Sequence, residues 1–114
     1  MKKLKLFMKK LKLFRQGDVL LRELKSIPKA ARPQKHNGPI VLALGEATGH
    51  KHQIAEELEN VEVFVGPEGQ IYLQVRAETA LEHEEHAPIR IPPGKYERIL
   101  QREYRPDQVR QVQD

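Results

Sequence analysis

The chain has 114 residues, 39% of them hydrophobic, and it contains no cysteine. A chain of this length builds one compact core, and without cysteine it has neither disulfides nor thiolate metal sites, so histidine and carboxylate side chains must hold any bound metal. Six of the 20 lysines and arginines lie in residues 1–14 with no acid among them, while the other 14 face 16 acids. This distribution argues against a basic nucleic-acid-binding face on the body of the protein.

The first 14 residues are two copies of the heptapeptide MKKLKLF, and translation from either Met1 or Met8 fits this duplication. Lysines limit the apolar runs of this segment to three residues at most, so we expect no signal peptide, no transmembrane segment and a cytoplasmic location. The segment is interpreted as a flexible lead-in; a basic amphipathic anchor for a membrane surface or nucleic acid is the alternative. We expect one β domain over residues 15–106 and a C-terminal tail over residues 107–114.

Short runs of alternating or continuous apolar residues, bounded by Gly, Pro and Asn, predict strands along the chain. The predicted strands cover residues 18–24, 39–44, 50–54, 61–65, 70–76, 79–83, 88–91 and 95–104, with a loop at 25–38 and one acidic turn at 55–60. The clearest element is the hairpin that joins 61–65 to 70–76 through Gly-Pro-Glu-Gly. About eight short strands at such spacing predict an all-β fold, a small single-domain barrel or sandwich.

Four of the five histidines occur in two close pairs, and they are the main candidates for a functional site. His50 and His52 form a His-x-His step on a predicted strand, which projects both imidazoles from one face. His83 and His86 are three residues apart, so along a strand they point in opposite directions. They converge only if the chain bends near Ala87-Pro88, where the proline interrupts strand pairing.

Two such pairs predict a site for a divalent metal ion (Zn, Fe or Mn) held by three or four of these histidines. Glu84 or Glu85 is a candidate additional ligand, and Glu85 is the candidate general base if the site performs metal-dependent hydrolysis or oxygen chemistry. The alternative is that all four are surface histidines at strand ends. The remaining His36 lies beside an Asn-Gly turn and is interpreted as a surface histidine without a functional role.

The order of these features resembles the first motif of the cupin family, a glycine, His-x-His, a later glutamate and a glycine. The matching residues are Gly45, His50, His52, Glu56 or Glu57, and Gly66. The segment from Ile91 to Tyr96 resembles the second cupin motif, although Glu97 stands where that motif has a histidine, and His83 and His86 have no counterpart. The resemblance implies a small β-barrel with a metal in its mouth.

A second resemblance, to the co-chaperonin GroES family, rests on residues 16–24, the following loop and the run GPIVLALG at 38–45. It implies a small β-barrel that assembles into rings, and it offers no role for the histidines.

The alternative function is a non-enzymatic binding module that contacts nucleic acid or protein through its basic termini. The C-terminal residues concerned are Arg98, Arg102, Tyr104, Arg105 and Arg110. Ser26, the only serine, lacks the glycine context of a nucleophile. A β domain of this size has edge strands to protect, so we expect a homo-oligomer; the sequence leaves the substrate undetermined.

Overall fold

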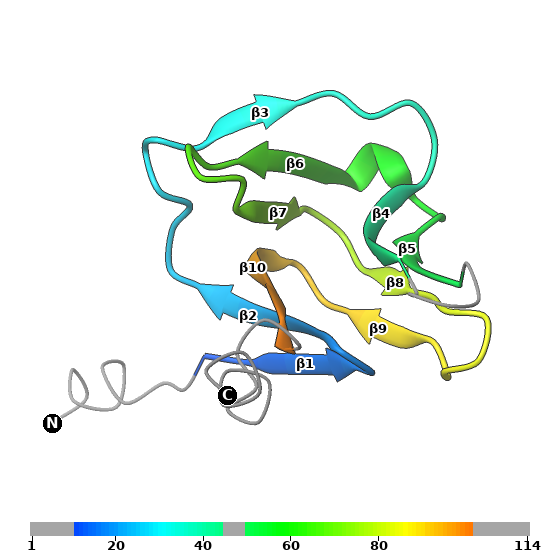
Figure 1. Ribbon diagram of the computed structural model, residues 1–114. Coiled ribbons are helices and arrows are strands. Elements are labelled where there is room, and N and C mark those ends of the chain that lie inside the picture. The colour runs from blue at the N-terminus through cyan, green and yellow to red at the C-terminus, as the bar shows by residue number, and fades with distance from the viewer. Residues whose placement is uncertain (1–10, 45–49, 102–114) are drawn as a thin grey trace, which may run out of the picture.

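The computed structural model describes residues 11–44 and 50–101 (Figure 1). The predicted all-β class is confirmed, with ten strands and one 3₁₀ turn in this part of the chain. The strands are β1 (Leu13–Gln16), β2 (Val19–Leu24), β3 (Arg32–Gln34), β4 (Ile40–Leu44), β5 (Lys51–Ile54), β6 (Val61–Val65), β7 (Ile71–Val75), β8 (Thr79–Leu81), β9 (Ile89–Ile91) and β10 (Gly94–Leu100), and the 3₁₀ turn η1 spans Leu58–Asn60. None of the described residues belongs to a helix that could cross a membrane.

Six strands form one antiparallel sheet in the order β1-β2-β10-β7-β6-β3. The predicted hairpin is its clearest element, since β6 pairs with β7 from Val61↔Val75 to Val65↔Ile71. Its turn closes where the Gly66 N–H donates to the Gln70 carbonyl at 2.7 Å. The strands β1 and β3 form the two edges of this sheet.

The remaining strands form two pairs, β4-β5 and β8-β9. An isolated bridge joins these pairs, because Gln53 of β5 and Glu82 after β8 exchange two backbone hydrogen bonds of 2.9 and 2.8 Å. Figure 1 shows β5 next to β8 accordingly. The bridge therefore brings the start of β5 and the turn after β8, which carry the two histidine pairs, to the same part of the molecule.

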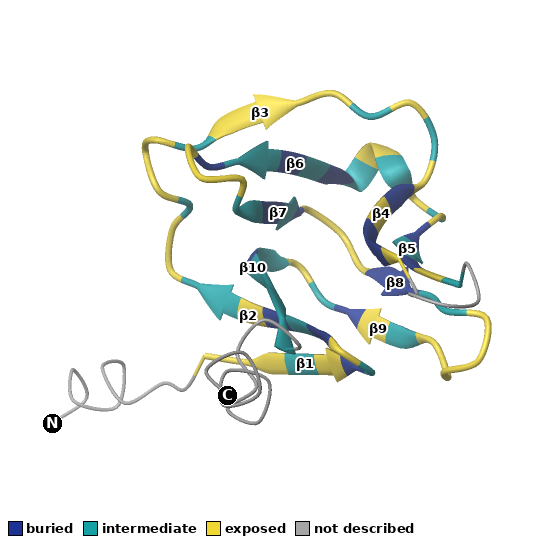
Figure 2. Ribbon diagram, in the orientation of Figure 1, coloured by how far each residue is buried: buried dark blue, intermediate teal, exposed yellow. Residues whose placement is uncertain are grey.

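The core takes side chains from both sets of strands (Figure 2). The largest completely buried side chains include Leu21, Leu42, Ile54, Leu73 and Tyr96. Each buried aliphatic side chain of this size contributes about 1.5–3 kcal/mol to the free energy of unfolding. The core therefore fixes the sheet and the strand pairs relative to each other.

The structure also contains β3, a strand that the sequence does not predict, and β1, a strand that begins inside the segment interpreted as a lead-in. The strand β3 lies in the predicted loop 25–38, and all three of its residues are exposed, so it carries no apolar alternation. It forms because β6 offers it a pairing partner, and Pro33 is tolerated because an edge strand pairs on one side only. The strand β1 begins at Leu13, in the second copy of the duplicated heptapeptide, and pairs with β2.

Several predictions concern residues outside the described part of the chain. They are the role of residues 1–10, the turn at 45–49 with Gly45, the end of the predicted last strand, the residues Arg102, Tyr104, Arg105 and Arg110, and the tail 107–114.

Candidate metal centre

The structure brings the two histidine pairs together at one place. His50 immediately precedes β5, His52 is the second residue of β5, and His83 and His86 lie in the turn between β8 and β9. The ring centroid of His83 lies 4.3 Å from that of His52, 4.6 Å from that of His86 and 5.5 Å from that of His50. The centroids of His52 and His86 are 5.8 Å apart. The four imidazoles thus form one cluster, with His83 at its centre.

Gln16, at the end of β1, is the buried side chain that joins these segments. Its Nε2 donates to the carbonyls of Leu81 and Ala87, both at 2.9 Å, and its Oε1 lies 2.9 Å from His52 Nδ1. Carbonyl oxygens only accept hydrogen bonds, so the amide nitrogen must face them and the amide oxygen must face the histidine. The His52 Nδ1 therefore carries a proton, and the lone pair of the neutral ring is on Nε2, the nitrogen that can bind a metal.

The turn that contains His83 and His86 is held at both ends and from within. Gln16 binds the carbonyls on either side of it, at Leu81 and Ala87. Inside it, His83 Nδ1 accepts the N–H groups of Glu85 at 3.0 Å and His86 at 3.2 Å. These bonds produce the bend that the convergence of the second pair requires. They also put the lone pair of the neutral His83 ring on Nδ1, so coordination through Nε2 requires that nitrogen to release its proton.

Gly17 lets the chain pass close beneath the imidazoles. Its φ is +57°, and a Cβ at this position would lie 2.8 Å from His86 Nε2 and 3.1 Å from His52 Cε1. The left-handed backbone conformation favours glycine here, and a larger residue would displace the His86 and His52 rings. Sequence reasoning missed Gln16 and Gly17, because their partners are distant in the chain and neither residue stands in a recognisable motif.

Two carboxylates adjoin the cluster. Glu84 Oε1 accepts the Lys51 N–H at 2.9 Å, and this hydrogen bond is the main reason that the pKa of the Glu84 carboxyl lies below its usual value. His50, His83 and Glu84 each offer one ligand atom, and these atoms all lie within 4.8 Å of one another. Glu85, the candidate general base, is largely exposed, with Oε1 3.5 Å from His50 Nδ1.

A small pocket opens beside this group. Its volume is about 140 Å³, and it is lined by Lys51, Gln53, Glu82, His83 and Glu84. Two of these residues, His83 and Glu84, also belong to the group of possible ligands. The site therefore has direct access from solvent for a metal ion and for a small molecule.

The glutamates of the cupin resemblance make other contacts. The Glu56 carboxylate lies 3.4 Å from Arg90 Nη1, and Glu57 Oε1 accepts a hydrogen bond from Asn60 Nδ2 at 3.2 Å. Glu97, in the second motif, forms an ion pair with Arg22 across β10 and β2. The carboxylates beside the histidines are instead those of Glu84 and Glu85. The resemblance to cupins stays a prediction.

Comparison with known proteins identifies the family to which this chain belongs. Neither the curated proteins nor the solved structures include a match to this chain. Residues 15–101 match the model of a family described as Domain of unknown function (DUF8820). This range covers most of the chain and includes Gln16, Gly17, the four clustered histidines and both adjoining glutamates, so the chain belongs to the DUF8820 family.

Proposed function

We propose that this protein binds a divalent metal ion through its clustered histidines, with Glu84 as the carboxylate ligand. The observation that carries the proposal is the hydrogen bond between Gln16 and His52. A buried amide that fixes the tautomer of a histidine, and so orients its other nitrogen, is the arrangement that supports metal-binding imidazoles in known sites. Imidazole and carboxylate ligands suit Zn²⁺, Fe²⁺ or Mn²⁺, and a set rich in imidazole favours Zn²⁺.

Electrostatics support a cation at this place. Glu84 holds a negative charge near His50 and His83, and Glu85 adds a second one beside His50. The ring centroids of the four imidazoles lie 4.3–5.8 Å from a neighbour, so an ion at this place would have several nitrogen atoms near it.

The proposal extends to chemistry at the same site. A bound metal ion would supply a Lewis acid for hydrolysis or a centre for oxygen chemistry. His52, the most buried of the four imidazoles, would hold the ion, while Glu85 would take a proton from a bound water or substrate as general base. The pocket beside His83 and Glu84 would admit the substrate.

We also propose that the protein is cytoplasmic and works as a homo-oligomer. The lack of cysteine suits a reducing compartment. The strands β1 and β3 are edge strands of the large sheet, and Leu13 on β1 is 60% exposed, which a partner subunit would cover.

The test is metal analysis of the protein purified without a histidine tag. We expect one equivalent of metal after incubation with Zn²⁺ and desalting, and titration calorimetry should give the same stoichiometry. His52→Ala and His83→Ala should each abolish stoichiometric binding. His36→Ala is the matched control, since His36 lies outside the cluster, and it should bind like the unchanged protein. If the protein retains none of the three ions, Zn²⁺, Fe²⁺ and Mn²⁺, after incubation and desalting, the proposal is contradicted.

A further inference from the structure

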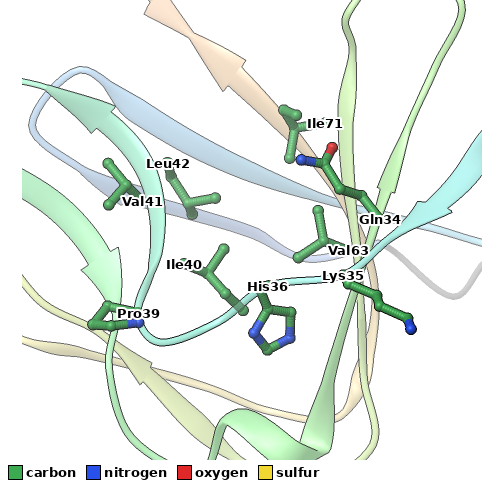
Figure 3. A pocket seen from close by; sticks show the side chains of 9 residues that line it. All are labelled: Gln34, Lys35, His36, Pro39, Ile40, Val41, Leu42, Val63 and Ile71. Carbon is green, nitrogen blue, oxygen red and sulfur yellow. The ribbon is translucent and has the colours of Figure 1, made fainter.

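The six-stranded sheet carries apolar side chains on both of its faces. Its inner face looks toward the core and holds Val63 and Leu73, which are 8% and 0% exposed. Figure 3 shows Val63 and Ile71 among the side chains that line a pocket of about 280 Å³ on this inner side of β6 and β7. Successive residues of a strand point to opposite faces, so their chain neighbours Phe64 and Tyr72 point outward.

The strand register aligns one row of outward side chains across all six strands of this outer face. From one edge of the sheet to the other, the row consists of Leu13 on β1, Arg22 on β2, Glu97 on β10, Tyr72 on β7, Phe64 on β6 and Pro33 on β3. A further apolar pair, Leu20 of β2 beside Ile99 of β10, lies next to this row on the same face. The outer face is therefore apolar on both sides of the ion pair between Arg22 and Glu97.

These outward side chains take no part in the hydrophobic core. Among the described residues, the core and the side chains that pack on it include none of the apolar residues of the outer face, which are Leu13, Leu20, Phe64, Tyr72 and Ile99. Tyr72, in the middle of the row, is 7% exposed, whereas Leu13 is 60% exposed and the other three are half-buried. A sheet with one face in water alternates apolar and polar residues, and a sheet covered on both faces does not. The outer face is thus an apolar surface of the kind that marks a protein contact.

The charges on the outer face suit a second copy of the same face. Its charged residues are three basic and two acidic ones, namely Arg15, Arg22, Lys95, Glu62 and Glu97. Arg22 pairs with Glu97, and Arg76 Nη2 lies 2.7 Å from Glu62 Oε1. A face with so little net charge does not attract nucleic acid, and two copies of it meet without opposing blocks of like charge.

The end of the chain and the edges of the sheet are poorer candidates for this contact. Residues 102–114, which follow β10, include only three hydrophobic residues, Tyr104, Val109 and Val112. Three side chains are too few to cover a face of six strands. At the β3 edge, Pro33 has no N–H to donate to a further strand. At the β1 edge, the Gln16 side chain already binds the carbonyls of Leu81 and Ala87 in the neighbouring segments.

We propose that a second copy of this chain covers the outer face, so that two six-stranded sheets pack face to face about 10 Å apart. This inference rests on the proposed homo-oligomer and names its contact surface. The contact is isologous, since the same row of side chains comes from both copies. Six strands about 4.8 Å apart and about five residues long give each copy a face of roughly 400 Å². Such an area is at the small end for specific interfaces, so the dissociation constant of the dimer is in the micromolar range.

The experiment measures the mass of the full-length protein by sedimentation equilibrium between about 1 μM and 500 μM, a range that brackets the expected constant. The unchanged protein should show a monomer–dimer equilibrium. Leu13→Glu and Phe64→Glu, on opposite sides of the face, should each raise the dissociation constant about tenfold or more, because each puts an unpaired charge into the contact. Leu44→Glu is the matched control, since Leu44 is 57% exposed but lies on β4, outside the large sheet. It should associate like the unchanged protein.

The outcomes distinguish the outer face from other contacts. A protein that stays monomeric at the highest concentration would overturn both the homo-oligomer and this interface. An effect of Leu13→Glu without one of Phe64→Glu would place the contact at the β1 edge, and an equal effect of Leu44→Glu would show general association. Either result would overturn the proposed face and leave the homo-oligomer standing. Circular dichroism checks that each variant folds, and Phe64→Ser replaces Phe64→Glu if the latter does not. None of these substitutions touches the histidines, so failure here leaves the metal proposal standing.

Discussion

Two turns of this molecule show how differently local and distant residues determine structure. The turn from Gly66 to Gln70 is closed by its own residues, with the Gly66 N–H on the Gln70 carbonyl and the Glu68 N–H on the Gln70 side chain. The turn that carries His83 and His86 is fixed largely by Gln16, which is 65 and 71 residues away from the two carbonyls it binds. The first turn connects two strands, and the second one assembles a site.

The two turns differ in whether a substitution changes stability alone or stability and metal binding together. The turn of the hairpin is closed by its own residues, so substitutions of exposed polar residues there have small effects on stability. The histidine turn depends on a buried polar network, in which each unsatisfied group has a large cost. Substitutions in that network should therefore affect stability and metal binding together, and those at its exposed carboxylates should affect metal binding alone.

Gln16→Leu should have the largest effect. Leucine fills a similar volume but leaves His52 Nδ1 and the Leu81 and Ala87 carbonyls without their partner, which costs about 3–5 kcal/mol of the free energy of unfolding. Zn²⁺ affinity should fall by about 10- to 100-fold, because the tautomer of His52 is no longer fixed. Urea unfolding and titration calorimetry measure the two effects.

Gln74→Leu is the control for this change, since Gln74 lies on β7 within the sheet and away from the histidines. It should change the free energy of unfolding by no more than about 0.5 kcal/mol. Equal effects of the two substitutions would show that Gln16 has no special role and would remove the contrast between the two turns.

The core of the sheet should show its own pH dependence, through Tyr96. Burial raises the pKa of this phenol to about 12, and its OH donates to the Pro92 carbonyl at 2.6 Å. The unfolded chain releases the proton near pH 10 and the folded chain near pH 12, so between these values the folded state binds more protons. The contribution of Tyr96 to stability should therefore be constant below pH 10 and fall by about 2–3 kcal/mol as the pH rises to 12.

Tyr96→Phe isolates this contribution. It should lower stability by about 1 kcal/mol at neutral pH, through loss of the hydrogen bond, and make the fall above pH 10 shallower. Urea unfolding of both proteins from pH 8 to 12 gives the difference between the two slopes, and identical slopes would contradict the assignment to Tyr96.

Gly17→Ala should have the next largest effect. An added Cβ meets His86 Nε2 at 2.8 Å and also requires a left-handed residue, so we expect a loss of about 1–3 kcal/mol in the free energy of unfolding. Gly69→Ala in the hairpin turn is the matched comparison, because its φ is +84° but nothing lies within 4 Å of the new Cβ. It should cost only the backbone part, about 1 kcal/mol. A Gly17→Ala loss no larger than that of Gly69→Ala would mean that His86 moves aside freely.

These effects explain which parts of the structure the sequence could predict. The hairpin of β6 and β7 has both its signals within 15 residues, so its bounds are predicted almost to the residue. The strand β3 carries Pro33 and no apolar residue, and only pairing with β6 makes it a strand. The geometry of the site likewise has one part that local sequence predicts and one part that depends on distant residues. Strand alternation predicts the relation of His50 to His52, whereas the bend that brings in His86 depends on Gln16 and on backbone N–H groups that have no sequence signature.

The smallest effect should come from Glu84→Gln, which tests whether the cluster and its carboxylate act as one ligand set. Glutamine keeps an oxygen that can accept the Lys51 N–H but removes the charge, and the residue is fully exposed, so the unfolding transition should not move. Zn²⁺ affinity should nevertheless fall about tenfold, because an amide oxygen is a much weaker ligand than a carboxylate. The control is Glu82→Gln, which removes a charge from the same pocket outside the group formed by His50, His83 and Glu84. If the two variants lose affinity equally, the carboxylates act only through the general field of the site, and the histidines alone hold the metal.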